Sequence, residues 1–400
     1  MNSQRNFLEK LLNGASVEWK TLGEVSKVLR GRRLTRDKLS DNEKFPVFHG
    51  GLEPLGFYGQ SNRPANSVMI INVGASAGTV GYSDKDFWSS DGCYCIEHTG
   101  KINNKFLYYF LIGEQHFLQS RVRKAGIPTL DALVIEKISI PIPCPNNPKK
   151  SLEIQQKIVA ILDSFTELTA ELTAELTARK MQYSYYREKL YYYDKNEVQH
   201  LPMGDEKIGK FIRGGGLQKK DFTETGVGCI HYGQLYTYYG TYTDMTKSFV
   251  SEEFAKKARM AKYGDLVIAT TSETDEDVCK AVAWLGDEEI AVSSDACYYR
   301  HNLNPKYVAY FFQTEQFQKQ KRPFITGTKV RRVNADDVAK IKIPVPSKEE
   351  QERVATILEK FDTLTNSITE GLPKEIELRK KQYEYYRDLL LTFPKDNLEE

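Results

Sequence analysis

Lysines and arginines gather in four short segments of this sequence, and these residues have the clearest chemical potential in the chain. Residues 30–38 hold five basic side chains and one acid, and residues 319–332 hold six basic side chains and no acid. Lys and Arg contact phosphate, and Arg also donates two hydrogen bonds to guanine O6 and N7. We therefore expect the chain to bind a polyanion such as a nucleic acid.

The candidate contacts form two series, one in each half of the chain. They are Arg30, Arg32, Arg33, Arg36, Lys38, Arg121, Arg123 and Lys124, followed by Arg213, Lys219, Lys220, Lys321, Arg322, Lys329, Arg331 and Arg332. Candidates for base-edge contacts are His49, His231, Tyr232, Gln234 and Tyr236. Glycines beside the arginines permit close approach to phosphate. A single Lys or Arg is more often an ordinary solvated residue, but clusters at corresponding places in both halves favour a binding role.

Motifs of common catalytic and metal sites are absent from the sequence. There is no G-x-x-x-x-G-K-[ST] phosphate loop, no N-P-P-[FY] run of the adenine methyltransferases, no H-E-x-x-H and no G-x-S-x-G. The six cysteines form no C-x-x-C pair and are expected to be reduced, as in the cytoplasm. We expect no catalytic, cofactor or metal residue in this chain.

Composition places the chain among ordinary globular proteins of two to three domains. It has 400 residues, 40% of them hydrophobic, and a formal net charge of +2. A binding surface must therefore come from local clustering of charge. No run of eighteen apolar residues and no secretory leader is found, so no association with a membrane is expected.

The sequence is one unit written twice. The I-P-I-P of residues 140–143 returns as I-P-V-P at residues 343–346, and R-K-M-Q-Y-S-Y-Y-R at 179–187 returns as R-K-K-Q-Y-E-Y-Y-R at 379–387. Weaker echoes pair Leu29-Arg30-Gly31 with Ile212-Arg213-Gly214, and residues 89–94 with 293–298. The two halves share these motifs but carry different insertions between them. This indicates two globules of one fold that contact different partners.

Each unit is expected to open with an α+β globule and to close with a long helix. Residues 67–73 and 265–270 predict buried strands, 105–111 and 306–312 predict helices, and 138–143 and 341–346 predict edge strands that end in prolines. The domains are then 1–150 and 196–347 for the globules, and 151–195 and 348–394 for the helices, the second of them interrupted at residues 371–373. Two long amphipathic helices in one chain are expected to pair with each other, antiparallel, as a coiled coil with a pseudo-twofold axis.

A tetrapeptide, E-L-T-A, occurs three times in succession at residues 167–178. Each copy would lengthen a helix by about 6 Å. One interpretation is a plain helix with a leucine ridge, and the other is a ruler between the globules. The residues concerned are Glu167, Leu168, Leu172, Leu176 and Ala178.

Tyrosines at the ends of the two helices have a separate role. Tyr183, Tyr185 and Tyr186 match Tyr383, Tyr385 and Tyr386. Tyrosine is favoured at half-wet interfaces, so these residues are expected to pack between helices or against a partner subunit rather than to stack on bases.

Two variable globules, each followed by I-P-x-P, a Q-x-x-I/V-x-x-I-L-like helix start and a Q-Y-x-Y-Y-R helix end, resemble the specificity subunits of type I restriction-modification enzymes. The triplicated E-L-T-A run resembles the subfamily with tetrapeptide repeats in the central helix. The resemblance implies that each globule is a target-recognition domain for one half of a bipartite, asymmetric site in double-stranded DNA. It implies helices that set the spacer and dock two modification (methyltransferase) subunits, and restriction/translocase subunits as further partners. S-adenosylmethionine, ATP and Mg would then belong to those partners.

Two other classes of function remain as alternatives. A purely structural coiled-coil scaffold would have no reason to carry paired basic clusters on unlike globules. A self-contained DNA methyltransferase should show a cofactor motif. Binding to a randomised duplex pool and methyl transfer by the purified chain distinguish the three.

Overall fold

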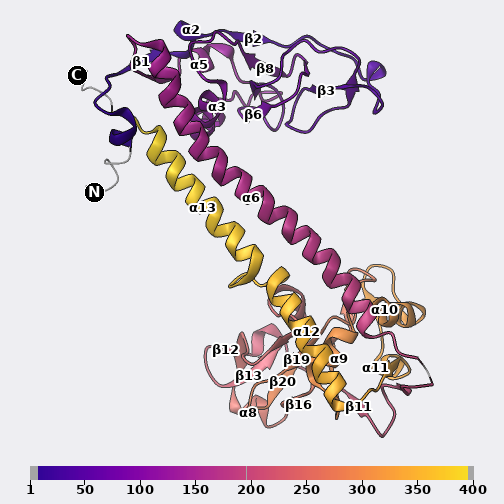
Figure 1. Cartoon of the computed structure of the whole chain (residues 1–400). Helices are drawn as coiled ribbons and strands as arrows, with labels where there is room; N and C mark the ends of the chain where they lie inside the picture. The colour runs from indigo at the N-terminus through magenta and orange to yellow at the C-terminus, as the bar shows by residue number, and fades with distance from the viewer. Residues whose placement is uncertain (1–7, 195, 395–400) are drawn as a thin grey trace. The chain divides into compact units, whose positions relative to one another are not determined.

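The computed structural model describes residues 8–194 and 196–394, drawn in Figure 1. The chain divides into two compact units, called here unit 1 (Met1–Leu172 and Ile376–Glu400) and unit 2 (Thr173–Glu375). Both mix helices with sheets, which confirms the predicted α+β class with two globules and long helices. The division falls within the long helices rather than at their ends, so each unit contains a globule together with helical segments.

Unit 1 is built on a four-stranded antiparallel sheet in the order β2-β8-β5-β6. Its strands are β2 (Val28–Arg30), β5 (Ser67–Ile71), β6 (Val80–Ser83) and β8 (Cys93–Ile96); a second sheet holds β4 (Phe57–Tyr58), β3 (Phe45–Phe48) and β7 (Trp88–Ser89), and a third pairs β1 (Val17–Thr21) with β9 (Ser139–Pro143). The short helices are α2 (Leu22–Val25), α3 (Asn104–Gly113), α4 (Gln115–Ser120), α5 (Ala132–Glu136) and the 3-10 turn η1 (Arg36–Lys38).

Unit 2 repeats this plan with more strands. One sheet runs β11 (Gly209–Arg213), β21 (Ala296–His301), β17 (Leu266–Ala269), β19 (Ala281–Trp284), β14 (Tyr242–Thr243); another runs β12 (Phe222–Thr223), β15 (Ser248–Val250), β13 (Val227–Ile230), β20 (Ile290–Val292), β16 (Met260–Ala261). Two-stranded pairs are β10 (His200–Pro202) with β23 (Lys342–Pro344) and β18 (Thr271–Ser272) with β22 (Arg331–Arg332). The helices are α7 (Tyr232–Thr237), α8 (Glu252–Ala255), α9 (Pro305–Phe311), α10 (Glu315–Lys321) and α11 (Ala335–Val338), with 3-10 turns η2 (Lys219–Asp221) and η3 (Arg322–Phe324).

The central strand of each unit is buried on both faces, as predicted. In β5, Val68 and Ile70 belong to the large core under α3, whereas Met69 and Ile71 belong to a separate cluster with both cysteines of β8. In β17 the side chains of alternate residues likewise enter two different clusters. Side chains of a strand alternate between faces, so an unbroken apolar run is needed where both faces are covered. The predicted proline-ended strands, β9 and β23, lie in two-stranded sheets, where a missing donor is tolerated.

The same polar contacts fasten the long helix to the globule in both units. The backbone N–H of Asn103, the N-cap of α3, donates to the buried side chain of Gln155 (2.8 Å). In unit 2 the N–H of Asn304, the N-cap of α9, donates to buried Gln351 (2.9 Å). These contacts explain why the repeated helix start carries glutamine.

The first long helix, α6 (Pro148–Leu190), is continuous over 43 residues. Its start lies three residues before the predicted 151–195, since proline fits the first turn of a helix, and its end lies five residues before the predicted one. The second is divided into α12 (Lys348–Asn366) and α13 (Gly371–Leu391). The interruption was predicted at residues 371–373 but lies before them. Residues 367–370 separate α12 from α13. Gly371 begins α13 at φ +80°, and a Cβ added at this position would collide with the carbonyl oxygen of Thr363.

Within each unit the helical segments pack against each other in opposite directions. In unit 2, Tyr183 and Tyr186 of α6 stack on Phe361 of α12, and Tyr193 beyond the end of α6 reaches Glu350 near the start of α12. In unit 1, Phe165 of α6 stacks on Tyr386 of α13 at 5.2 Å, and Figure 1 shows α6 leaving the globule where α13 returns to it. The antiparallel pairing predicted from the sequence is therefore confirmed within both units.

Candidate nucleic-acid interface

Strand direction brings the basic segments of each unit to one end of its sheet. In unit 1, β2 and β5 run antiparallel to β8, so the ends of β2 and β5 and the start of β8 coincide. Unit 2 repeats this with β11, β17 and β21. The basic loops after β2 and β11 therefore begin beside two similar turns, called here the S-S-D turns. They are residues 89–91 before β8 and residues 293–295 before β21.

The glycine that follows the arginine in both loops has a packing role. A Cβ on Gly31 would collide with the carbonyl oxygen of Ser90, and one on Gly214 with that of Ser293. Glycine permits this approach because it has no side chain. This packing role was not predicted, and the approach of these glycines to phosphate stays a prediction. Both glycines meet the same turn, although Ser90 and Ser293 differ by one position in the repeat, so the weak upstream repeat reflects one fold.

A histidine follows the neighbouring strand at the same end in each unit. His49 follows β3 and His231 follows β13, and both strands pair in parallel with the strand that leads into the S-S-D turn. His49 Nδ1 accepts from the Gly92 N–H (3.2 Å) and lies 3.3 Å from the Asp91 carboxylate, while His231 Nδ1 accepts from the Gly233 N–H (3.3 Å). An Nδ1 that accepts leaves the proton on Nε2, so each imidazole presents a donor at Nε2.

Electrostatics at His231 favour the neutral form. Burial lowers the pKa of His231 below its usual value, and nearby Lys219 lowers it further, against an opposing effect of Asp295. A neutral histidine with Nε2–H can donate one hydrogen bond to a base edge or a phosphate oxygen.

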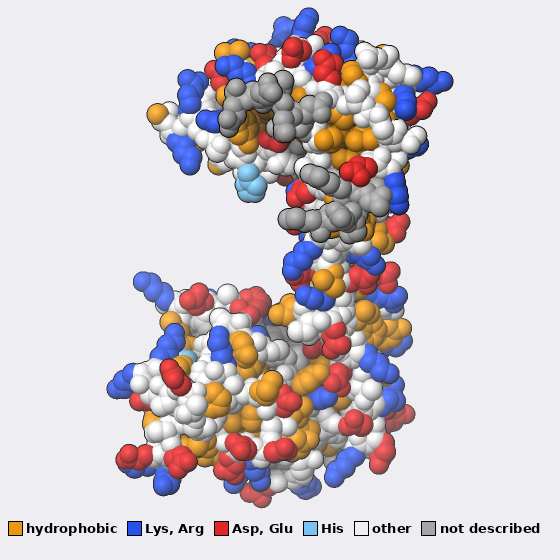
Figure 2. All heavy atoms as spheres, turned by 90° about the vertical axis from the view of Figure 1, so that its left-hand side faces the viewer, with side chains coloured by type: hydrophobic (Ala, Val, Ile, Leu, Met, Phe, Trp, Pro, Cys, Tyr) orange, Lys and Arg blue, Asp and Glu red, His pale blue; other side chains and the backbone are white. Residues whose placement is uncertain are grey.

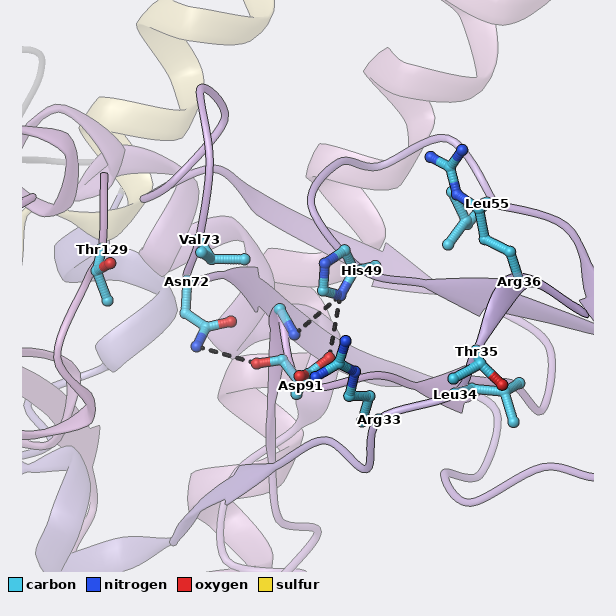
Figure 3. Close-up of a pocket in the computed structure, with 11 residues that line it drawn as sticks. Arg33, Leu34, Thr35, Arg36, His49, Leu55, Asn72, Val73, Asp91 and Thr129 are labelled. Atoms are coloured by element: carbon cyan, nitrogen blue, oxygen red, sulfur yellow. Dashed lines mark hydrogen bonds and ion pairs between the residues drawn. The ribbon is translucent and has the colours of Figure 1, made fainter. Parts of the chain in front are cut away.

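In unit 1 these segments surround an open pocket of about 550 Å³, shown in Figure 3. Arg33 and Arg36 come from the basic loop after β2. His49 follows β3, and Asp91 belongs to the turn before β8. Thr129 comes from a loop far along the chain. Buried Asn72 also lines the pocket; its Nδ2 donates to the Asp91 carbonyl (3.3 Å), and its Oδ1 has no partner within the described protein. Asn72 and Asp91 were missed from the sequence because only the fold brings them to the basic residues.

Each unit also carries a basic hairpin over the end of its central strand. Hairpin 1 (residues 123–129) closes with two backbone hydrogen bonds between Arg123 and Thr129, and hairpin 2 (residues 326–332) with two between Thr326 and Arg332. Hairpin 1 bridges to Val73 after β5, and Arg332 of hairpin 2 pairs with Thr271 of β18 after β17. The basic clusters at 121–124 and 329–332 are thus parts of one repeated structure.

Most predicted contact residues lie on the surface, but Lys321 does not. The exposed ones are Arg30, Arg32, Arg33, Arg36, Lys38, Arg121, Arg123, Lys124, Arg213, Lys219, Lys220, Arg322, Lys329 and Arg332, with Arg331, His49, His231 and Tyr232 half-buried. Lys321 is fully buried, and its ammonium donates to the carbonyls of Glu276 (3.0 Å) and Val278 (2.8 Å). Its assignment to DNA binding is wrong, because the end of α10 uses it to hold the acidic loop.

Some of the remaining candidates are engaged within the protein. Arg331 forms an ion pair with Asp275 (2.8 Å), and Arg322 forms one with Glu315 (3.1 Å). Gln234 caps α7 through the His231 N–H and donates to Ser248, and the Tyr236 hydroxyl donates to the Thr271 carbonyl (2.7 Å). In unit 2, the side chains of α7 therefore hold the loop at His231 in place through these hydrogen bonds. On the face seen in Figure 2, basic and acidic side chains are interspersed on both units, so the candidate interface is defined by these loops rather than by a charged face.

Lys321 and Lys329 should give opposite results when altered. Lys321→Met keeps the side-chain volume but leaves two buried carbonyls without their donor, so we expect a loss of about 2 kcal/mol in the stability of unit 2. Lys329→Ala removes an exposed charge, so stability should hold while the salt dependence of DNA binding falls by about one phosphate contact. Hydrogen exchange and a salt titration measure the two effects. A reduced salt slope for Lys321→Met at native stability contradicts the structural role of Lys321.

The tyrosines divide into packed and exposed members. Tyr183 is buried beneath Phe361, Tyr186 stacks on Phe361, Tyr386 on Phe165, and Tyr383 lies against Tyr109 at 6.2 Å. The expectation of packing between helices is confirmed for these four, and the buried Tyr183 is withdrawn as a contact for a partner subunit. Tyr185 and Tyr385 are 59% and 48% exposed at matching positions.

The two α+β units carry basic loops at equivalent ends of their sheets. This arrangement is that of a nucleic-acid-binding protein with two different recognition domains. Comparison with known proteins gives the family. A model described as "Type I restriction modification DNA specificity domain" matches residues 16–179 and 208–378. The specificity subunit of the Escherichia coli EcoR124I/EcoR124II enzyme is 35% identical, with 98% of both chains covered, and a putative type I specificity subunit of Haemophilus influenzae is 31% identical, covering 98% of this chain and 100% of that one.

Solved structures agree on the fold. The S subunit of a type I restriction-modification system from M. genitalium has a TM-score of 0.60 at 16% identity, with 96% of this chain and 98% of that chain covered. The chain belongs to the family of type I restriction-modification DNA specificity subunits. None of the helices in the described ranges combines the length and apolarity that a membrane crossing requires.

Proposed function

We propose that this chain reads a bipartite, asymmetric sequence in double-stranded DNA, unit 1 reading one half and unit 2 the other. One observation carries the proposal: both units place a basic loop, a histidine with an Nε2 donor and a basic hairpin at the same end of an equivalent sheet. The loops themselves differ, as different half-sites require. Phosphate contacts position such a protein on DNA, and contacts to base edges specify the sequence.

The chain acts without catalysis of its own, as the recognition component of a complex. Its partners are two modification (methyltransferase) subunits and the restriction/translocase subunits, and these hold S-adenosylmethionine, ATP and Mg. Tyr185 and Tyr385, exposed at equivalent positions of α6 and α13, support docking of one modification subunit on each helical end. The complex works in the cytoplasm, where its DNA is.

The E-L-T-A run supports the proposal of a ruler. Residues 167–178 lie inside the continuous α6, and none of them is fully buried. The boundary between the compact units falls within the run. A copy can therefore be added or removed without opening a core, which is what a length-setting element needs.

Single-arginine variants test the assignment of one half-site to each unit. Arg332→Ala in hairpin 2 is expected to weaken recognition of one half-site by about tenfold or more, and Arg123→Ala in hairpin 1 to weaken the other. The measurement is selection from a randomised duplex pool by the complex reconstituted with its modification subunits. Equal loss at both halves contradicts separate reading.

The same selection separates the alternatives. Enrichment of no motif at all favours a scaffold without a DNA role. Methyl transfer by the purified chain alone favours a self-contained methyltransferase.

A further inference from the structure

The tips of the two basic hairpins share a feature that their charges do not explain. Ile127 in hairpin 1 is 71% exposed, and Val330 in hairpin 2 is 46% exposed. Both are β-branched aliphatic residues, and both hairpins also carry exposed basic side chains. Exposing such a side chain gains nothing for folding, because its burial is what stabilises a protein.

The two side chains occupy the same position of the repeated structure. Hairpin 1 is closed by Arg123 and Thr129, and hairpin 2 by Thr326 and Arg332, so the loops between the closing pairs are equally long. Ile127 and Val330 each lie two residues before the second closing residue. The loops differ in detail, since the glycine with positive φ is Gly126 in one and Gly327 in the other. An aliphatic residue kept at one position of two otherwise different loops indicates a shared contact.

The surroundings of each tip suit a nucleic acid. Lys124 and Arg123 are exposed in hairpin 1, and Lys329 and Arg332 in hairpin 2. Both hairpins are anchored by backbone hydrogen bonds to the chain after the central strand, from Leu130 N–H to the Asn72 carbonyl (2.9 Å) and from Val333 N–H to the Thr270 carbonyl (3.1 Å). The major groove of B-DNA admits a two-stranded β-ribbon, and the C5 methyl of thymine is the apolar group it offers.

We propose that Ile127 and Val330 are specificity-determining residues that contact the C5 methyl group of thymine in the major groove, one in each half-site. The inference rests on the proposed function and adds the apolar part of the reading. The flanking lysines and arginines hold phosphates on either side of the groove. A β-branched side chain has few rotamers and loses little entropy on contact.

Truncation of either tip tests the contact without touching charge or core. Ile127→Ala should lower preference by about fourfold to tenfold at one or two adjacent positions of one half-site, and Val330→Ala at positions of the other half, from the apolar surface lost. Because no charge is removed, the salt dependence of binding should stay unchanged. Ile368→Ala, at a 79% exposed isoleucine between α12 and α13, is the matched control and should alter no position.

A change on the DNA side completes the test. In the affected half-site, each thymine of either strand is replaced in turn by deoxyuridine, which lacks only the methyl group. The complex of the unaltered chain should prefer thymine at the affected position, and the complex of the Ala variant should bind both duplexes alike.

The possible outcomes distinguish this inference from the proposed function. A two-part motif that is unchanged in both Ala variants, or an affected position at which the unaltered complex reads thymine and uracil equally, overturns the methyl contact alone. A complex of the unaltered chain that selects no two-part motif overturns the proposed function together with the inference.

Discussion

Deletion of residues 171–174 from α6 is expected to leave both half-sites unchanged while shortening the spacer between them by one to two base pairs. The deletion removes four residues from a continuous helix whose two ends belong to different compact units. It shortens the helix by about 6 Å and turns one end relative to the other by about 40°. A base pair of B-DNA rises about 3.4 Å and turns roughly 35°, so rotation favours one base pair and translation two.

Methylome sequencing of a strain that carries the deletion measures both the half-sites and the spacer. The control is the double substitution Glu171→Ala with Thr173→Ala, which alters the same copy but keeps the residue count, and should preserve the spacer. An altered half-site, or a spacer unchanged by the deletion, would contradict the ruler. A spacer altered by the control would show that side chains rather than length set the distance.

Asp265→Ala is expected to destabilise unit 2 by about 3 kcal/mol. Asp265 is 2% exposed at the start of β17, and its carboxylate accepts from Arg300 Nη2 (2.8 Å) and from the Lys262 N–H (2.9 Å). The hydrogen bonds from Arg300 to Asp265 raise the pKa of Arg300, which remains charged in the variant and loses its carboxylate partner. Asp265 is buried and Arg300 is half-buried, so removing the carboxylate costs more than removing a fully exposed pair.

Hydrogen exchange of the full chain, followed by mass spectrometry, locates the loss. Peptides from β17 and β21 should exchange faster, and peptides from β5 and β8 of unit 1 should not. Glu253→Ala is the control, because Glu253 and Lys257 are both more than 80% exposed and their ion pair is 3.7 Å long; the expected effect is below about 0.5 kcal/mol. Equal acceleration in both units would contradict their separate stability.

The sequence by itself determined the duplication, the long helices and the buried central strands. Three local patterns can be recognised without the tertiary structure. They are the apolar periodicity, the absence of Pro and Gly between residues 151 and 193, and the doubled tyrosine motif. It also located the basic segments and, through the resemblance, the family. These properties depend on residues close together in the chain.

Only the tertiary structure decided which residues share a site. Lys321 and Lys329 look alike in the sequence, but one is buried against two carbonyls and the other is exposed at a hairpin tip. Asn72, Asp91 and Thr129 meet at the pocket of unit 1 because antiparallel strands return distant segments to one end of a sheet. Burial and hydrogen bonding depend on contacts between distant residues, which neither composition nor spacing specifies.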